Sequence, residues 1–156
     1  MLTTQAHTAP LAWVRLLRAY AATTRALSAA LYAEHGLTIN DYEALLHLSR
    51  AEGQRMRRVD LAENLLLTAS GVTRLLDGLE DAALVERAAC SSDRRVVYAV
   101  LTDAGREKLA AAAQSHVASV RSLFGERFTE EELDQLAELL GRLPGAGGAD
   151  VDACGA

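Results

Sequence analysis

The sequence has few of the residues on which small disulfide-bonded or metal-binding domains depend. Cysteine occurs twice, at Cys90 and Cys154, which is too few for a disulfide framework, and the spacing of the pair resembles no zinc site. Aromatic residues make up 4% of the chain and proline occurs twice, a composition that disfavours a β-sandwich or barrel. The sequence also lacks a signal-peptide pattern and any run near the roughly 18 apolar residues of a membrane span. We therefore expect a reduced, cytoplasmic protein with no membrane partner.

Apolar residues, mainly alanine and leucine, make up half of the 156 residues. This length is enough for one domain with a real core and too short for two large ones. The apolar positions mostly recur at steps of three and four, which predicts a mainly α-helical fold. We expect a single domain over residues 1–143 and a disordered tail over residues 144–156, where glycine and alanine dominate without periodicity.

The net charge of −5 argues mildly against a nucleic-acid partner until it is divided along the chain. Residues 103–156 carry 5 basic and 10 acidic residues, which accounts for the whole deficit. Between residues 54 and 95, 7 arginines balance 7 acids and gather at the two ends, in Arg55-Met56-Arg57-Arg58 and in Arg94-Arg95. A fold that brings these ends onto one surface is locally basic despite the total.

Amphipathic periodicity predicts long helices at both ends of the chain. One covers residues 10–33, and an alanine-rich helix covers residues 102–124. Thr129 followed three residues later by Glu132 is a capping-box pattern, which predicts the start of a last helix that ends at Leu143.

The middle of the chain predicts a helix-turn-helix followed by a hairpin. The expected elements are helices over residues 38–51, 59–66 and 68–82, and strands over residues 84–89 and 96–101. Two short helices joined by a tight turn form a helix-turn-helix unit. Thr68 or Ser70 can cap its second helix, and the turn between the strands carries charge at Asp93-Arg94-Arg95.

Two segments of this middle part resemble a known family. The run LAENLLLTASGVTRLLD, residues 61–77, resembles the helix-turn-helix of the MarR (multiple antibiotic resistance regulator) family. Asp93-Arg94-Arg95, with Leu101-Thr102 and Ala104-Gly105 after it, looks like the wing signature of that family. The resemblance covers residues 10–143. It implies a mainly α fold with a small β-hairpin wing: a winged helix-turn-helix over residues 38–102, flanked by dimerisation helices over residues 10–33 and 103–143.

The resemblance also implies a homodimeric regulator that binds double-stranded DNA, with a repressor as the expected output. The first turns of a recognition helix face the major groove. These positions here are Thr68, Ser70, Gly71, Thr73 and Arg74. Hydroxyl groups can bond phosphates or base edges, and Arg74 can bind a guanine or a phosphate.

The hairpin tip would enter the minor groove, where phosphates on both walls concentrate negative potential. We expect Arg95 to insert and Arg94 to contact a phosphate, and the resemblance implies that Asp93 holds one of these arginines in position. The run Arg55–Arg58 either flanks the DNA backbone or is a solvated strand. Three positions depart from the family pattern: Gly78, Ala83 and Glu86. These departures lower the affinity for DNA that we expect, but they do not change the expected fold.

The outer helices carry more apolar surface than a small monomer needs to bury. The residues concerned are Leu11, Trp13, Val14 and Leu17 at one end and Leu133, Leu136, Leu139, Leu140 and Leu143 at the other. They either form a two-fold dimer interface or complete the core of the monomer. A dimer predicts a pseudo-palindromic operator with half-sites about one DNA turn apart.

Members of the resembled family commonly sense a small aromatic or phenolic effector between the dimer helices and the DNA-binding part. Candidate lining residues pair an apolar ring with a polar tip: Trp13, Tyr20, Tyr42, His47 and His116. The alternative is that these are ordinary core and interface side chains.

Other functions find less support in the sequence. No nucleophile with a base, paired carboxylates, phosphate loop or metal motif is evident, so we expect neither an enzyme nor a cofactor. His35, His47 and His116 do not fall at the i,i+4 spacing of a metal site on a helix. Cys90 has no basic neighbour that would lower its pKa, which argues against a redox switch. The remaining alternative is a winged-helix protein-interaction module without specific DNA binding.

Overall fold

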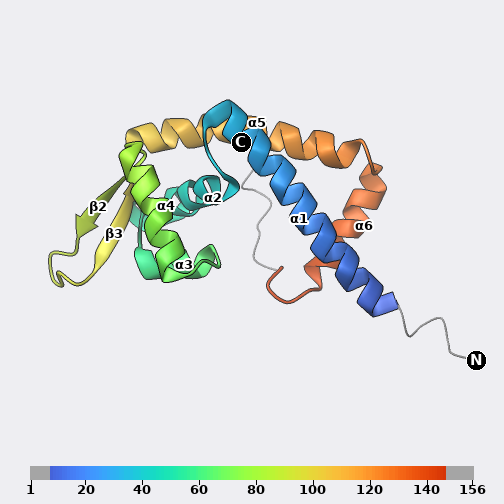
Figure 1. The fold of residues 1–156 in the computed structure, drawn as a ribbon, viewed down its shortest axis with the longest axis horizontal. Coiled ribbons are helices and arrows are strands. Elements are labelled where there is room, and N and C mark those ends of the chain that lie inside the picture. The colour runs from blue at the N-terminus through green and yellow to red at the C-terminus, as the bar shows by residue number, and fades with distance from the viewer. Residues whose placement is uncertain (1–7, 147–156) are drawn as a thin grey trace, which may run out of the picture. The chain divides into compact units, whose positions relative to one another are not determined.

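The computed structural model describes residues 8–146, and the chain divides into two compact units, one up to Leu109 and one from Ala110 on. His7, Cys154 and most of the predicted tail lie outside the described residues. The helices are α1 (Thr8–His35), α2 (Ile39–Arg50), α3 (Arg58–Asn64), α4 (Ala69–Asp81), α5 (Asp103–Gly125) and α6 (Glu130–Gly141), with a short 3-10 turn at Glu52–Gln54 (Figure 1). The expectation of a mainly α fold with a small hairpin is confirmed, and the helix ends differ from the predicted ones by about two residues.

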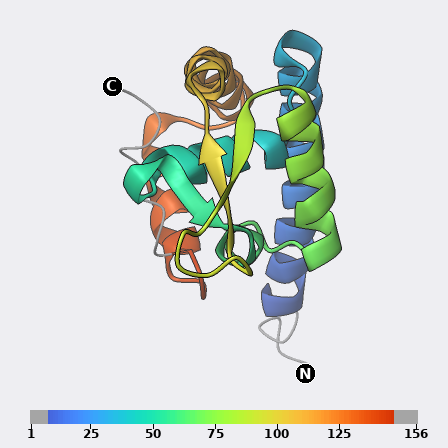
Figure 2. The same ribbon diagram turned by 90° about the vertical axis from the view of Figure 1, so that its left-hand side faces the viewer.

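The hairpin consists of β2 (Val85–Ala89) and β3 (Val97–Leu101), and a third strand, β1 (Arg55–Arg57), pairs with it. The described strands form one antiparallel sheet in the order β1-β3-β2, and Figure 2 shows α4 beside β2. The sequence predicted only an extended segment around β1. Strand β1 could not be predicted for two reasons. Its partner β3 lies more than forty residues further along the chain, with Met56 opposite Ala99, and a strand of three residues is too short to show an alternating pattern.

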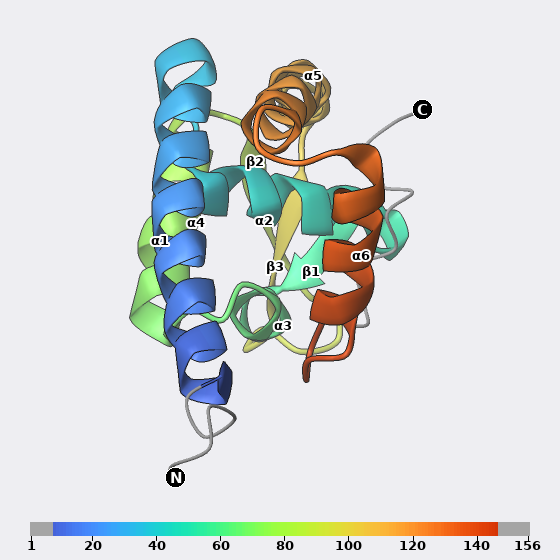
Figure 3. The same cartoon turned by 90° about the vertical axis from the view of Figure 1, so that its right-hand side faces the viewer.

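The core of the first unit lies between α2, α3, α4 and the sheet (Figure 3). The side chains buried there include Leu45, Leu48, Leu61, Leu65, Val72, Leu76, Leu79, Leu84, Val85, Ala99 and Leu101. They come from every element of the helix-turn-helix and the hairpin, so these elements fold as one body. The functional side chains on α4 and the hairpin are therefore held on a rigid frame.

Helices α1 and α6 contribute little to this burial. Of the 28 residues of α1, Leu31 is buried, and α6 buries none of its described side chains. The N-terminal half of α1 extends away from α2, α3 and α4 within the first unit (Figure 1). The large apolar side chains exposed on these two helices and just beyond are Leu11, Trp13, Val14, Leu17, Tyr20, Tyr32, Leu139, Leu140 and Leu143.

Candidate nucleic-acid interface

The recognition helix α4 begins at its cap residue, Thr68. The Thr68 hydroxyl accepts a hydrogen bond from the Gly71 backbone N–H at 3.1 Å and lies 3.3 Å from the Ser70 hydroxyl. Of the two caps that the sequence allowed, the structure uses Thr68. A Cβ atom at position 71 would lie 3.2 Å from the Thr68 hydroxyl oxygen, so Gly71 leaves the cap undisturbed. This start places the Ser70 side chain in solvent at the N-terminal end of the helix.

One side of α4 faces solvent and the other faces the core. Ser70, Arg74 and Gly78 are exposed and share the outer side, one helical turn apart. Arg74 forms no ion pair with the described residues. Nothing lies within 4 Å of a Cβ built at Gly78, so any side chain fits there. The opposite side buries Val72, Leu76 and Leu79.

Thr73 lies on the flank of α4 that faces the sheet. Its hydroxyl donates to the Ala69 carbonyl at 2.8 Å and accepts a long hydrogen bond from the Arg58 guanidinium at 3.5 Å. Thr73, Arg58 and Arg87 line a small cleft of about 80 Å³ between α4 and the sheet. The Thr73 hydroxyl is thus engaged with Ala69 and Arg58, whereas the Ser70 hydroxyl, 3.3 Å from that of Thr68, lies on the exposed side of the helix.

Arg87 joins the hairpin to the recognition helix. It projects from β2, and its guanidinium forms ion pairs with Asp77 and Glu80 of α4. The hydrogen bond and the charge of Glu80, followed by those of Asp77, raise the pKa of Arg87 above its ordinary value. Sequence reasoning missed this cluster. The sequence does contain Asp77 and Glu80 on a predicted helix and Arg87 on the strand that follows. No local pattern, however, predicts that the arginine pairs with these two acids.

The tip of the hairpin is a tight turn built around Asp93. Its carboxylate accepts a hydrogen bond from the Arg95 backbone N–H at 2.9 Å, and its carbonyl accepts one from the Val96 N–H at 3.0 Å. The resemblance implies that Asp93 holds one of the two arginines in position. In this structure it holds the backbone of Arg95, while the Arg94 and Arg95 side chains are exposed and form no ion pair with the described residues.

Cys90 lies at the start of this turn, half-buried, with its Sγ 3.1 Å from the Ser92 hydroxyl oxygen. The hydrogen bond from the Ser92 side chain, followed by bonds from the backbone of Ser92 and Asp93, lowers the pKa of Cys90. The sequence argument that no basic neighbour lowers this pKa was therefore incomplete, because hydrogen bonds to the thiolate have the same effect.

The base of the hairpin is anchored by a close contact with α5. The Leu84 carbonyl accepts the Thr102 N–H at 3.2 Å, and the Thr102 hydroxyl donates to the Ala83 carbonyl at 2.8 Å. A Cβ at Gly105 would lie 2.1 Å from the Leu84 carbonyl oxygen, so glycine is required there. This explains the Thr102 and Gly105 positions of the wing signature.

Ala83 ends the recognition helix in the left-handed region, with φ +57°. The Ala83 N–H donates to the Glu80 carbonyl at 2.8 Å and the Leu84 N–H to the Leu79 carbonyl at 2.9 Å, the paired bonds of a Schellman motif. Glycine is the preferred residue for this conformation because a Cβ strains it. The departure from the family pattern at Ala83 thus lies at a strained position.

The side chains of the basic run Arg55–Arg58 do not all lie on the same side of the sheet. The Arg55 guanidinium carbon lies 4.9 Å from the centre of the Tyr98 ring, and Arg57 forms an ion pair with Asp60 at 2.7 Å. Pairing of Arg57 with Tyr98 and of Arg87 with Ala99 places Arg57 and Arg87 on opposite faces. Arg58, in contrast, reaches towards Thr73 of α4.

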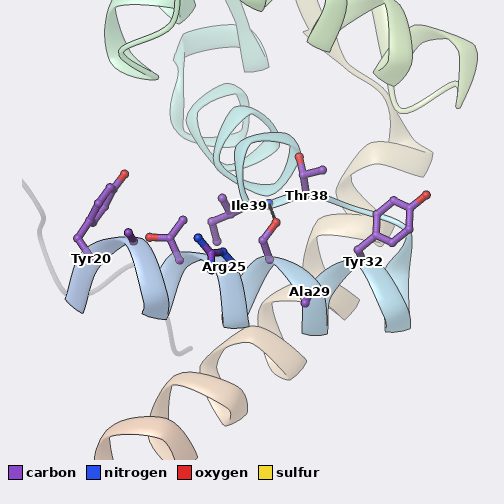
Figure 4. Close-up of a pocket in the computed structure, with 9 residues that line it drawn as sticks. Tyr20, Arg25, Ala29, Tyr32, Thr38 and Ile39 are labelled. Atoms are coloured by element: carbon purple, nitrogen blue, oxygen red, sulfur yellow. Dashed lines mark hydrogen bonds between the residues drawn. The ribbon is translucent and has the colours of Figure 1, made fainter. Parts of the chain in front are cut away.

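A groove of about 520 Å³ lies along α1 where α2 begins. In Figure 4, the Tyr20 and Tyr32 side chains rise at either end of this groove, with Arg25 between them. Two of the lining residues are joined to each other, because the Ser28 hydroxyl accepts a hydrogen bond from the Ile39 N–H at 3.2 Å. Arg25 and Tyr32 were missed by sequence reasoning, because helical periodicity alone does not show where α2 meets α1.

The five predicted effector residues lie in different surroundings. Tyr20 lines the groove and Trp13 is exposed elsewhere on α1. Tyr42 is buried in α2 and His47 is half-buried there. His116 belongs to the second unit, where burial lowers its pKa.

Two further features concern ions and membranes. Within residues 8–146, no three histidine, cysteine or acidic side chains gather in a way that could hold a metal ion. In the same range, no helix combines the length and apolar character needed to cross a membrane.

Comparison with known proteins agrees with this geometry. The sequence profile of the MarR family matches residues 35–96. The chain is 29% identical over 112 residues to the HTH-type transcriptional repressor YetL of Bacillus subtilis (strain 168), a match that spans 72% of this chain and 66% of that protein.

Solved structures extend the similarity to most of the chain. AbsC, a MarR family transcriptional regulator from Streptomyces coelicolor, is 39% identical, with a TM-score of 0.74 over 90% of this chain and 92% of that one. Sco3205, a MarR family transcriptional regulator from the same organism whose structure was solved in complex with DNA, is 30% identical, with a TM-score of 0.76 over 89% of this chain and 85% of that one. The chain therefore belongs to the MarR family of transcriptional regulators.

Proposed function

We propose that this protein is a sequence-specific DNA-binding transcriptional repressor, and not an enzyme, in which residues 1–143 act as one MarR-type domain. The observation that carries the proposal is the combination of an exposed α4 side, Ser70 and Arg74, with a hairpin tip that bears Arg94 and Arg95 on the same rigid unit. These arginines form no ion pairs with the described residues, and arginine side chains are the usual means of binding phosphates and guanine. The relative Sco3205, solved with DNA, supports this reading.

In the proposed complex, α4 lies in the major groove of double-stranded DNA and the hairpin tip in the adjacent minor groove. Ser70 and Arg74 contact base edges or phosphates from the first turns of α4, where Thr68 and Gly71 form the cap. Thr73 supports the helix flank through Arg58. Asp93 shapes the tip so that Arg95 enters the minor groove and Arg94 contacts a phosphate.

We also propose that the protein acts as a homodimer through its outer helices. The apolar side chains that α1 and α6 expose would cover one another between two copies; Trp13 is 59% exposed and Leu139 is 55% exposed in the single chain. A two-fold dimer matches a pseudo-palindromic operator. Sedimentation equilibrium should give twice the mass of one chain, and a monomer at all concentrations would contradict this proposal.

A small aromatic or phenolic effector is the ligand that we propose for the region around α1 and α2. The groove beside Tyr20 supports this, since it combines aromatic side chains with the Arg25 guanidinium and hydroxyl groups. The other four predicted residues, Trp13, Tyr42, His47 and His116, remain candidates. The two recognition helices of a dimer bind DNA only at a spacing that matches the groove. An effector that binds more tightly to a dimer with a different spacing therefore lowers the affinity for DNA. A panel of phenolic compounds should raise the melting temperature and weaken DNA binding; a panel without effect on either would contradict the proposal.

The central experiment is selection of bound duplexes from a random DNA pool, followed by gel shift of the enriched sequence. We expect a pseudo-palindrome with half-sites about 10 base pairs apart and a steep fall of affinity with salt. A single half-site should bind much more weakly. If no sequence is enriched and binding does not depend on salt, the protein is a winged-helix protein-interaction module instead.

A further inference from the structure

The recognition helix carries an acidic flank that opposes its proposed function. Asp77 and Glu80 lie on the side of α4 next to the sheet, and their side chains are 54% and 25% exposed. A carboxylate near the DNA backbone repels the phosphates that the helix must approach. The helix therefore needs a neighbouring positive charge on this flank.

Arg87 supplies that charge from the hairpin. Its Nε donates to Glu80 Oε1 and its Nη2 donates to Asp77 Oδ1, so one guanidinium serves both carboxylates. The alternation of β2 places Val85, Arg87 and Ala89 on the face of the sheet towards α4. The ion pairs change the local charge of this cluster from two negative charges to one. The guanidinium is held by bonds on two of its nitrogens and lies across the helix–strand junction.

We propose that Arg87 is a positioning residue that acts as an internal counterion: it offsets one of the two negative charges on the acidic flank of α4 so that the helix can approach DNA phosphates, and it does not contact DNA itself. The inference rests on the proposed function. It assigns a role to a side chain outside the tip of the hairpin and explains how a recognition helix with acids beyond Arg74 can bind DNA.

The mechanism predicts a particular salt dependence. Without Arg87, both carboxylates act on phosphates within a Debye length, which is about 10 Å at 0.1 M salt and about 3 Å at 1 M. The loss of affinity should therefore be largest in low salt and should shrink as salt rises. A loss that came from a distorted helix would persist at every salt concentration.

The test compares four proteins on the selected operator: the wild type, Arg87→Gln, the triple variant Arg87→Gln with Asp77→Asn and Glu80→Gln, and Arg57→Gln. The last is a matched control, because Arg57 is ion-paired and 51% exposed, against 48% for Arg87, but lies on the opposite face of the sheet. At about 0.1 M salt we expect Arg87→Gln, whose cluster carries two negative charges, to bind about tenfold more weakly, and the triple variant, whose cluster carries none, to bind at least as tightly as the wild type. Arg57→Gln should lose about twofold or less.

Two outcomes would overturn the inference while the wild type still binds DNA. If the triple variant stays as weak as Arg87→Gln, Arg87 contacts DNA directly. If Arg57→Gln loses as much as Arg87→Gln, the effect is one of total charge. Failure of the wild type to bind any duplex would overturn the proposed function as well. Melting temperatures show whether each variant folds, and Arg87→Lys, which keeps the charge, should bind better than Arg87→Gln even if both are less stable.

Discussion

Helices α2 and α6 have the same length and the same kind of start, yet they differ completely in burial. Each has 12 residues and begins with a threonine capping box, formed by Thr38 with Asp41 and by Thr129 with Glu132. Helix α6 buries none of its described side chains. Helix α2 buries Tyr42, Ala44, Leu45 and Leu48.

The difference shows that the formation of a helix and the burial of its apolar face are separate requirements. Capping and periodicity decide where a helix forms, and they are local. What covers its apolar face depends on the rest of the assembly. Under the proposed function, α2 is covered by its own chain and α6 by a second copy, so changes in the two helices should be measured by different properties.

The largest effect is expected for a core residue of α2. Leu45 has no exposed surface, so Leu45→Ala should lower the free energy of unfolding by about 2–5 kcal/mol through lost burial and a cavity. Urea denaturation gives this value. As a control, Leu48→Met preserves volume and should cost less than about 1.5 kcal/mol. If Leu45→Ala lowered the free energy of unfolding by less than Leu48→Met does, α2 would not be part of the stabilising core.

The second prediction concerns the apolar side of α6. Replacing Leu139 of α6 and Leu143 just beyond its end, which are 55% and 44% exposed, by aspartate should weaken a dimer at least about 100-fold, or about 2.7 kcal/mol, because two charges from each chain would be buried at the interface. Sedimentation equilibrium measures the dissociation constant. Glu131→Gln on the exposed start of the same helix is the control and should leave it unchanged. A double variant that remains fully dimeric would break the comparison, since α6 would then lie outside the interface.

The two capping boxes allow a more direct comparison. Thr38→Ala and Thr129→Ala should each cost about 1 kcal/mol of local helix stability. The Thr38 cap begins a helix in the core, so we expect its loss to lower the unfolding free energy of the whole first unit. Loss of the Thr129 cap should instead raise amide hydrogen exchange within the first turns of α6. Equal effects of both variants on global unfolding would indicate that α6 is as strongly coupled to the fold as α2.

The smallest expected effect extends the comparison from helix starts to a helix end. Ala83 adopts φ +57°, so Ala83→Gly should stabilise the protein by up to about 1 kcal/mol through relief of strain. The preceding residue is a matched control, because Ala82 has an unstrained φ of −83°. Ala82→Gly relieves no strain and only raises the conformational entropy of the unfolded chain, so it should destabilise the protein. Thermal unfolding of both variants decides this, and stabilisation by both would show that backbone strain at position 83 is not the cause.

Much of this structure could be predicted because its signals are local. The helices, the capping box at Thr129 and the hairpin follow from periodicity and from residues three or four apart. The choice of Thr68 rather than Ser70 as the cap of α4 was already among the two expected possibilities. The family resemblance, confirmed by the comparisons, rests on such contiguous stretches.

The parts that escaped prediction depend on contacts between distant residues. Strand β1 exists because Arg55–Arg57 meets β3, and Arg87 matters because it meets Asp77 and Glu80. In the same way, the bond from Asp93 to the Arg95 backbone depends on the exact course of the turn. The roles assigned to individual DNA-contacting and effector residues stay predictions.

The contact between Gly105 and the Leu84 carbonyl has a consequence for sequence variation. Even the smallest side chain at position 105 would overlap the Leu84 carbonyl oxygen, which itself accepts the Thr102 N–H. A library randomised at this position and selected for a folded protein should return glycine alone, whereas Gly78, with open space around it in the DNA-free chain, should accept most residues. Two glycines that look alike in the sequence would thus differ sharply in the side chains that the fold accepts.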